Sequence, residues 1–239
     1  LWKFISKKLF KISCPSAGLM KQLYEKKIFN ESKLLFLPDP IIEAKLFSKK
    51  SPNINFQEGQ NLLNEDFFIS AGRLTKQKNF GYLLEEFKEF SKENSNYKLL
   101  IFGEGEQKKY LMKKIMKDKM ERKIFLMGHS NKIFGYMRKA KAFILSSLWE
   151  DPGFVIIEAA MNNLSVISSD CKNGPVEFLE KGQAGFLYKT NKKGALKDAI
   201  KNFIDNKNNL KNKKILAKKN CLKYTLFRHS QTLQEILAF

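Results

Sequence analysis

Between residues 66 and 190, short apolar runs alternate with segments of helical periodicity, and this alternation limits the possible folds more than any other feature of the chain. The strand candidates are residues 66–71, 98–102, 124–127, 142–146, 164–168 and 185–188. After Asn79, apolar residues recur every three or four positions, which is the spacing of an amphipathic helix. Pro175 suits the first position of a further helix. Strands and helices in this order predict an α/β fold with a parallel sheet covered on both faces.

The flanking segments do not follow this pattern. Before residue 43 there are two strand candidates, residues 9–14 and 33–37, and one helix opened by Pro15 and Ser16, which is too little for a domain. The stretch after them lacks periodicity and contains Ser-Pro-Asn, which indicates a linker. We therefore predict four parts: the end of an N-terminal domain (1–42), a hinge (43–65), a complete second domain (66–205) and a polar helical segment that packs across onto the first domain (206–239).

The chain carries 44 basic and 24 acidic residues, a net charge of +20. Such a surface attracts anions, whether phosphates, nucleic acid or an acidic membrane face. Arginine occupies only four positions, while lysine and asparagine are abundant throughout, as a codon bias would produce. The charge alone therefore does not identify a partner.

The three cysteines, Cys14, Cys171 and Cys221, have neither C-x-x-C spacing nor the even count of a disulfide framework, which fits a reducing cytosol. No apolar run reaches the roughly 18 residues that a membrane span requires. Residues with metal-ligand spacing are also missing from the sequence. The chain opens inside a lysine-rich amphipathic segment without an initiator methionine, so we interpret it as a fragment.

The sharpest candidate site is the segment from Glu150 to Glu158. The first glutamate follows the strand candidate 142–146, and the second lies just inside a helix. Gly153 can leave backbone N–H groups open at the start of that helix, where the helix dipole favours an anion. Two carboxylates beside an anion site could hold a sugar and a ribose joined by a diphosphate. The alternative is that Glu150 is a solvated loop residue and that Glu158 only favours the helix start.

A second candidate is the loop after the first strand, from Gly72 to Asn79. Arg73 can bind phosphate oxygens in pairs, and Lys78 adds a mobile positive charge. Lys76 in the same loop fits an ordinary surface lysine, because lysine occurs in nearly half of the loops of this chain.

Two other loops give weaker signals. Gly103 and Gly105 follow the strand at 98–102, where the sequence favours a tight turn over a ligand site. Gly128 and His129 follow the strand at 124–127, and a single loop histidine is more often incidental than an acid or a base. Cys171 has no evident histidine partner, and we predict it to be inert.

In this order the motifs resemble the donor-binding half of family 4 glycosyltransferases of GT-B fold. The matching elements are Gly-Arg-Leu-x-x-x-Lys-Asn from Gly72, Phe-Gly-Glu-Gly from Phe102, the Gly-His strand end, Glu-x7-Glu from Glu150, and Ser-Asp-Cys-Lys-Asn-Gly-Pro-Val-Glu from Ser169. The resemblance is dense over residues 65–205. It implies a Rossmann-like parallel sheet with helices on both faces, the C-terminal domain of a GT-B enzyme, with the N-terminal domain largely missing.

The resemblance also implies roles for single residues. Arg73 and Lys78 would neutralise the donor diphosphate as the glycosidic bond breaks, Glu150 would face the sugar hydroxyls, and Glu158 would bind the ribose. Backbone N–H groups of Gly153, Phe154 and Val155 would meet the distal phosphate or sugar. The remaining donor-binding candidates are Gly72, Gly103, Gly105, Gly128 and His129. The reaction would retain the anomeric configuration and need no metal or other cofactor.

Two departures from the family matter. The commoner pattern after the first glutamate is Gly-Phe-Gly, whereas here it is Asp151-Pro152-Gly153-Phe154, and Pro152 has no N–H to donate. The exact sugar contacts therefore stay open. The N-terminal domain carries most of the acceptor site in this family, so we expect the fragment alone to be inactive.

We expect a glycosyltransferase of hexosyltransferase type that moves a sugar from a UDP-sugar or GDP-sugar to a glycan or lipid-linked acceptor in cell-surface polysaccharide, lipopolysaccharide or glycan biosynthesis. The expected location is the cytoplasm, with peripheral contact between the basic surface and the acidic inner face of the membrane. A nucleotide-sugar epimerase or a phosphorylase on the same fold stays open, because fold does not settle function.

Two non-enzymatic alternatives are weaker. A nucleic-acid-binding module would gather its basic residues on one face, whereas these lysines spread along the whole chain, so we expect no nucleic-acid partner. A nucleotide-sugar sensor would tolerate a degenerate site, whereas Arg73, Lys78, Glu150 and Glu158 are all present.

Overall fold

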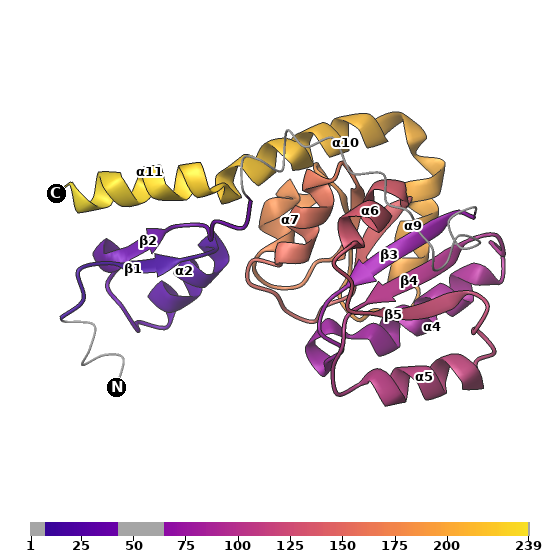
Figure 1. The fold of residues 1–239 in the computed structure, drawn as a ribbon. Coiled ribbons are helices and arrows are strands. Elements are labelled where there is room, and N and C mark those ends of the chain that lie inside the picture. The colour runs from indigo at the N-terminus through magenta and orange to yellow at the C-terminus, as the bar shows by residue number, and fades with distance from the viewer. Residues whose placement is uncertain (1–7, 43–64, 239) are drawn as a thin grey trace.

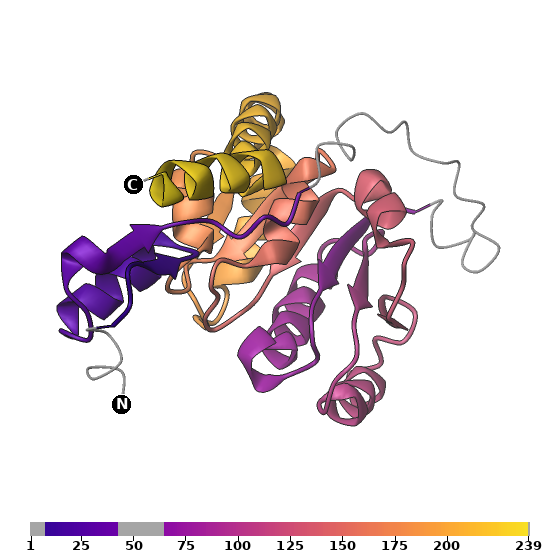
Figure 2. The same ribbon diagram turned by 60° about the vertical axis from the view of Figure 1, so that its left-hand side comes forward.

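The computed structural model describes residues 8–42 and 65–238, and a six-stranded parallel sheet forms its main body (Figures 1 and 2). The strand order is β5-β4-β3-β6-β7-β8. The first three strands step outward from β3 to one edge and the next three step outward from β6 to the other, so the direction of winding reverses between β3 and β6. This is the 3-2-1-4-5-6 order of doubly wound sheets, which have a crevice at the reversal. The strands are β3 (Phe67–Ala71), β4 (Lys98–Phe102), β5 (Ile124–Gly128), β6 (Ala142–Leu145), β7 (Ser165–Ser169) and β8 (Phe186–Tyr188).

Helices cover both faces of this sheet, as the alternating sequence predicts. One face packs against α4 (Phe80–Ser91), α5 (Lys108–Lys117) and α9 (Ala195–Asp205). The other packs against α6 (Ile133–Lys139), α7 (Phe154–Met161), α8 (Pro175–Phe178) and α10 (Lys207–Asn220). Each face thus has its own hydrophobic core, and both the predicted fold class and the helix that begins at Pro175 are confirmed.

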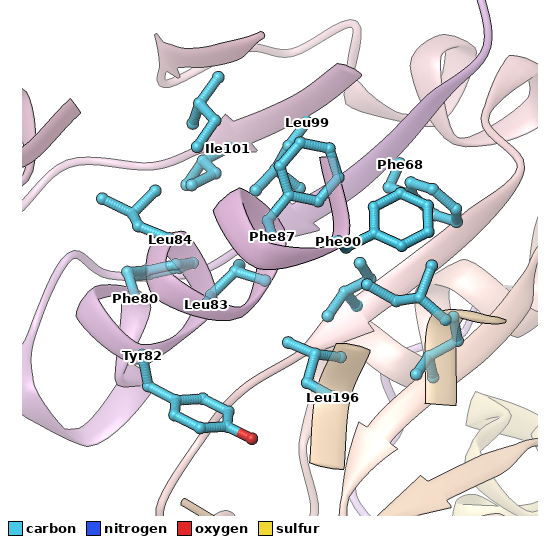
Figure 3. Close-up of a cluster of buried hydrophobic side chains, with 14 of the residues drawn as sticks. Phe68, Phe80, Tyr82, Leu83, Leu84, Phe87, Phe90, Leu99, Ile101 and Leu196 are labelled. Carbon is cyan, nitrogen blue, oxygen red and sulfur yellow. The ribbon is translucent and has the colours of Figure 1, made fainter. Parts of the chain in front are cut away.

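The core on the α4 face is rich in aromatic side chains (Figure 3). The Phe68 ring of β3 meets the rings of Phe87 and Phe90 edge to face, with centroids 6.3 and 6.0 Å apart. All three side chains are fully buried. Burial of each contributes about 2 kcal/mol, which explains why the periodic segment after Asn79 becomes a helix.

The predicted strands of the main sheet match the structure within one residue at each end. The strand at 98–102 is reproduced without change, and the others gain or lose single residues where loops begin. Their accuracy follows from burial on both faces, which makes each strand a short, nearly continuous apolar run.

Before the main sheet, residues 8–42 form a small separate unit, at the left of Figure 1. It consists of two parallel strands, β1 (Ile12–Cys14) and β2 (Leu34–Phe36), joined by α2 (Ala17–Glu25). Ser16 caps α2, since its Oγ accepts a hydrogen bond from the N–H of Leu19 at 3.1 Å. Nearly all of the predicted hinge, 43–65, lies outside the described residues.

The last helix, α11 (Leu226–Leu237), lies alongside this N-terminal unit (Figures 1 and 2). Ile42 donates its N–H to the carbonyl of Tyr224 and accepts from the N–H of Leu226, at 3.0 and 3.1 Å. The Nδ1 of His229 contacts the carbonyl oxygen of Pro38 at 2.8 Å. The end of the chain is therefore tied to residues that stand more than 180 positions earlier.

Two expectations from composition can be compared with the described residues. Cys14, Cys171 and Cys221 are all buried and free. Among the described helices, none has both the length and the apolar character needed to cross a membrane.

Candidate functional site

Two predicted site residues, Lys78 and Glu150, come together at the point where the winding of the sheet reverses. Lys78 ends the loop after β3, and Glu150 lies in the loop after β6. The Lys78 Nζ is 2.5 Å from Glu150 Oε1, and the two side chains are only 14% and 6% exposed. Ser147 donates a second hydrogen bond to the same Oε1, also at 2.5 Å. Glu150 is therefore a buried, paired carboxylate rather than a solvated loop residue, and the first alternative for it is excluded.

Three further hydrogen bonds, each to a backbone carbonyl, also join the two loops. Ser146 Oγ donates to the carbonyl of Lys78 at 2.7 Å. The N–H of Leu148 donates to the Gln77 carbonyl at 2.8 Å, and Gln77 Nε2 donates to the Trp149 carbonyl at 2.9 Å. These contacts hold the loop that carries the lysine against the loop that carries the glutamate.

The end of β7 supports the loop that carries Glu150. Ser169, the last residue of β7, donates its hydroxyl to the carbonyl of Ser147 at 2.7 Å. Both serines are completely buried. Sequence reasoning missed Ser146, Ser147, Ser169 and Gln77 as site residues. The available signal was the pair of adjacent serines that ends each of two neighbouring apolar strands.

The predicted glycine candidates pack the loops closely together. A Cβ on Gly103 would lie 1.9 Å from the carbonyl oxygen of Gly72, and one on Gly105 would lie 2.6 Å from that of Leu74. Gly103 has φ +133°, a conformation that favours glycine. The N–H of Gly103 also donates to the Gly128 carbonyl at 2.8 Å. The contacts that the structure records for these glycines are between loops, and their contact with a ligand stays a prediction.

Arg73 and His129, by contrast, have exposed side chains. In the part of the chain that the structure describes, neither side chain makes a hydrogen bond or an ion pair. Arg73 follows Gly72 directly, and a Cβ on Gly72 would touch the Lys78 side chain at 3.2 Å. Arg73 thus follows a residue that packs against the Lys78 side chain, and its guanidinium donors have no partner among the described residues.

Glu158 lies on the second turn of α7, further into the helix than the sequence analysis placed it. It shares a helix face with Phe154 and Val155, which stand four and three positions earlier. Burial raises the pKa of the Glu158 carboxyl above its ordinary value, and no charge or hydrogen bond opposes this shift. Over the described ranges its carboxylate oxygens have no partner. A half-buried carboxylate without a partner is a candidate ligand-binding group.

Gly153 is the N-terminal cap of α7 and adopts the left-handed region, with φ +88°. A Cβ there would approach the Glu150 side chain at 3.5 Å. The first N–H groups of any helix lack partners within the helix, so the turn at Phe154 and Val155 begins beside the Glu150 carboxylate with open donors. The predicted proximity of a helix start and the first glutamate is thus seen in the structure.

Asp151, where the sequence departs from the family pattern, and Glu177 both contact the N-terminal unit. Ser16 Oγ donates to Asp151 Oδ1 at 2.5 Å, and the N–H of Ala17 donates to Glu177 Oε2 at 3.1 Å. Burial raises the pKa of Asp151, and the hydrogen bond from Ser16 opposes that shift. Asp151 therefore links the loop of Glu150 to the start of α2.

Cys171 lies close to this site but has no reactive character. Burial raises the pKa of its thiol to about 11, so the thiol stays protonated at neutral pH. Within residues 8–42 and 65–238, no group of three His, Cys, Asp or Glu side chains is arranged to hold a metal ion.

The doubly wound sheet, its reversal and the charged loops at that point define a Rossmann-like domain of the kind found in GT-B glycosyltransferases. The family model of glycosyl transferases group 1 matches residues 53–220, and the chain belongs to this family. The finer assignment to family 4 stays a prediction.

Individual proteins agree with the family match. An uncharacterised glycosyltransferase of Methanocaldococcus jannaschii is 40% identical over 121 residues, which cover 50% of this chain and 30% of that protein. The amylovoran biosynthesis glycosyltransferase AmsD of Erwinia amylovora is 40% identical over 112 residues, which cover 47% of this chain and 31% of that protein. The chain thus spans about a third of the length of these relatives.

Among solved structures, Anabaena HepE in complex with UDP superposes with a TM-score of 0.85 and 17% identity. The superposition covers 98% of this chain and 65% of HepE. At this level of identity the likeness establishes the fold.

Proposed function

We propose that the full-length protein is a glycosyltransferase that takes a sugar from a nucleotide-diphosphate sugar and that this chain binds the donor. The observation that carries the proposal is the meeting of the Arg73–Lys78 loop and the Glu150 loop at the reversal of the sheet. Doubly wound sheets bind their ligands at this point, and the charges there suit a diphosphate flanked by hydroxyl groups. The crystal structure of HepE with UDP supports a nucleotide of this kind.

Each charged residue has a separate role in the proposed reaction. Arg73 and Lys78 bind the diphosphate and stabilise its negative charge as the glycosidic bond breaks, and the proposed reaction needs no metal ion. Glu150 accepts hydrogen bonds from the sugar hydroxyls, and Glu158 accepts them from the ribose. By resemblance to family 4, transfer retains the anomeric configuration.

The neighbouring groups complete the proposed donor site. The helix start at Gly153, Phe154 and Val155 contacts the distal phosphate or the sugar. His129 and Gly128 border the nucleobase, and Gly72, Gly103 and Gly105 shape the floor of the crevice. These assignments agree with the convergence of the four loops that carry these residues.

The acceptor is proposed to be a glycan or a lipid-linked sugar in cell-surface polysaccharide, lipopolysaccharide or glycan assembly. The relative from Erwinia amylovora, named for amylovoran biosynthesis, supports this class. The lysine-rich surface would meet the acidic face of the membrane, where a lipid-linked acceptor resides. Nucleic acid has no place in this proposal.

The proposed organisation follows the sequence boundaries. Residues 1–42 would end the acceptor domain, 43–65 form the hinge, 66–205 bind the donor, and 206–239 return to the acceptor domain. Because the chain spans only part of its relatives, we propose that transfer requires segments outside it and that this chain alone is inactive.

A thermal-shift panel on the full-length protein tests the proposal. The ligands are UDP, GDP, UDP-sugars, GDP-sugars and RNA, each at low and moderate salt. We expect one nucleoside diphosphate to raise the Tm at both salt concentrations, since binding to the native state stabilises it. Arg73→Ala should abolish the shift. A response to RNA alone that fades with salt would overturn the proposal in favour of a nucleic-acid-binding protein.

A further inference from the structure

The hydrogen bonds around Glu150 distinguish its two carboxylate oxygens. Lys78 and Ser147 both donate to Oε1, each at 2.5 Å. Across the described residues Oε2 accepts no hydrogen bond, and it is not among the polar atoms that are fully buried without a partner there. One oxygen is therefore anchored, and the other is accessible and has no partner among the described residues.

The two anchors of Oε1 differ in what they can do when a donor arrives. Lys78 carries an ammonium with three N–H donors, and a diphosphate in the crevice would compete for them. Ser147 is neutral and completely buried, so an incoming anion does not attract it away. Its hydroxyl is the contact to Glu150 that persists while the lysine is shared with phosphate.

Ser147 is itself held firmly in position. Its carbonyl accepts the Ser169 hydroxyl at 2.7 Å, and Ser169 is likewise completely buried at the end of β7. The hydrogen-bond chain runs from β7 through Ser169 and Ser147 to Glu150. Such a supporting chain fixes the rotamer of a functional carboxylate without touching the ligand.

We propose that Ser147 is the positioning residue that orients Glu150 so that its Oε2 accepts a hydroxyl of the donor sugar. The inference rests on the proposed function, because it assigns the sugar-facing group of the same site. It assigns to Ser147 a selective effect on the sugar part of the donor and little effect on the nucleotide part.

Isothermal titration calorimetry on the full-length protein tests this selectivity. The probes are UDP and GDP, and then UDP-glucose, UDP-N-acetylglucosamine and GDP-mannose. Ser147→Ala should weaken nucleotide-sugar binding about tenfold more than nucleoside-diphosphate binding, because it removes a hydrogen bond to a charged group. Ser165→Ala is the matched control. Its hydroxyl is buried at the other end of β7 and has no partner in the described part of the chain.

A double variant distinguishes an effect of Ser147 through Glu150 from a general loss of structure at the site. In Glu150→Ala, the further change Ser147→Ala should cause no additional loss of sugar selectivity, because the carboxylate through which Ser147 acts is already absent. If Ser147→Ala fails to fold, Ser147→Cys replaces it, since a thiol of similar size is a weak donor. That variant should show the same loss in a smaller degree.

The outcomes distinguish the two claims. If the unaltered protein binds no nucleotide or nucleotide sugar, the proposed function fails and the inference fails with it. If it binds them and Ser147→Ala weakens both classes equally, or neither, the inference alone is overturned.

Discussion

The two carboxylates of the Glu-x7-Glu motif occupy opposite kinds of environment. Glu150 is buried, paired with Lys78 and hydrogen-bonded by Ser147. Glu158 is half-buried, and neither it nor Arg73 has a side-chain partner among the described residues. The paired group, with the loops that hold it, is the assembled part of the candidate site, whereas Arg73 and Glu158 are its open part. We infer that the assembled part sets the geometry before a ligand binds and that the open part supplies the interactions that only a ligand completes.

The largest expected effect comes from breaking the assembled part at Gly103. In Gly103→Ala the new Cβ would lie 1.9 Å from the Gly72 carbonyl oxygen, at a φ of +133°. We expect a loss of at least about 4 kcal/mol in the free energy of unfolding, measured in urea. Gly182→Ala is the control, because Gly182 also has a positive φ but nothing within 4 Å of the added Cβ. It should cost about 1 kcal/mol, and equal losses would contradict a close contact between the loops.

The second-largest expected effect comes from breaking the buried ion pair of Lys78 and Glu150. Lys78→Met should lower the free energy of unfolding by about 3 kcal/mol, because it leaves the Glu150 carboxylate buried without its countercharge. Combining it with Glu150→Gln should restore part of that loss. The exposed pair of Lys92 and Glu89 is the control, and Lys92→Met should cost less than about 1 kcal/mol. Similar losses in the free energy of unfolding at Lys78 and Lys92 would show that the buried ion pair stabilises the fold no more than an exposed one.

The third prediction addresses the open part. Arg73→Ala in the full-length protein should reduce sugar transfer about 100-fold, since it removes the cation that we propose stabilises the diphosphate, and leave stability nearly unchanged. Lys76→Ala removes the same charge from the same loop, and we expect transfer within about twofold of the unaltered enzyme because exposed charges are screened. Transfer rates and unfolding curves measured together give the comparison. Equal losses of transfer would mean that loop charge, rather than the guanidinium, matters.

The smallest effect concerns Glu158. Burial raises its pKa in the folded protein, so the folded state holds the proton more tightly than the unfolded state does. The stability that the protonated Glu158 contributes is therefore fully present at a pH below the ordinary pKa of a glutamate. It is lost as the pH rises through the raised pKa of the folded protein. Glu158→Gln should raise the Tm at pH 8 and leave it unchanged at pH 4.

The same substitution should weaken nucleotide binding about tenfold at pH 8, because an amide replaces a charged acceptor. Calorimetry at pH 8 measures it. A lower Tm at pH 8 would show that the carboxylate has a stabilising partner after all.

Much of the fold could be predicted from the sequence because its information is local. Strands buried on both faces are short apolar runs, and the helix after Asn79 repeats its apolar residues with helical spacing, so each element is visible within about ten residues. The order of the charged motifs along the chain was visible in the same way. These features were enough for the fold class and for the choice of Arg73, Lys78, Glu150 and Glu158.

The pairing inside the site was decided only by the tertiary structure. Lys78 and Glu150 are 72 positions apart, and their contact depends on β3 and β6 being neighbours at the reversal of the sheet. Ser147 was not recognised as a site residue in the sequence, because its significance comes from the Glu150 carboxylate that it contacts. Gly103 was recognised as a turn or ligand candidate, but its close approach to the Gly72 carbonyl was visible only in the structure. The sequence by itself determined which elements form and which chemical groups are present. Packing across the sheet decided which of those groups are anchored and which remain open, because that depends on contacts between residues far apart in the chain.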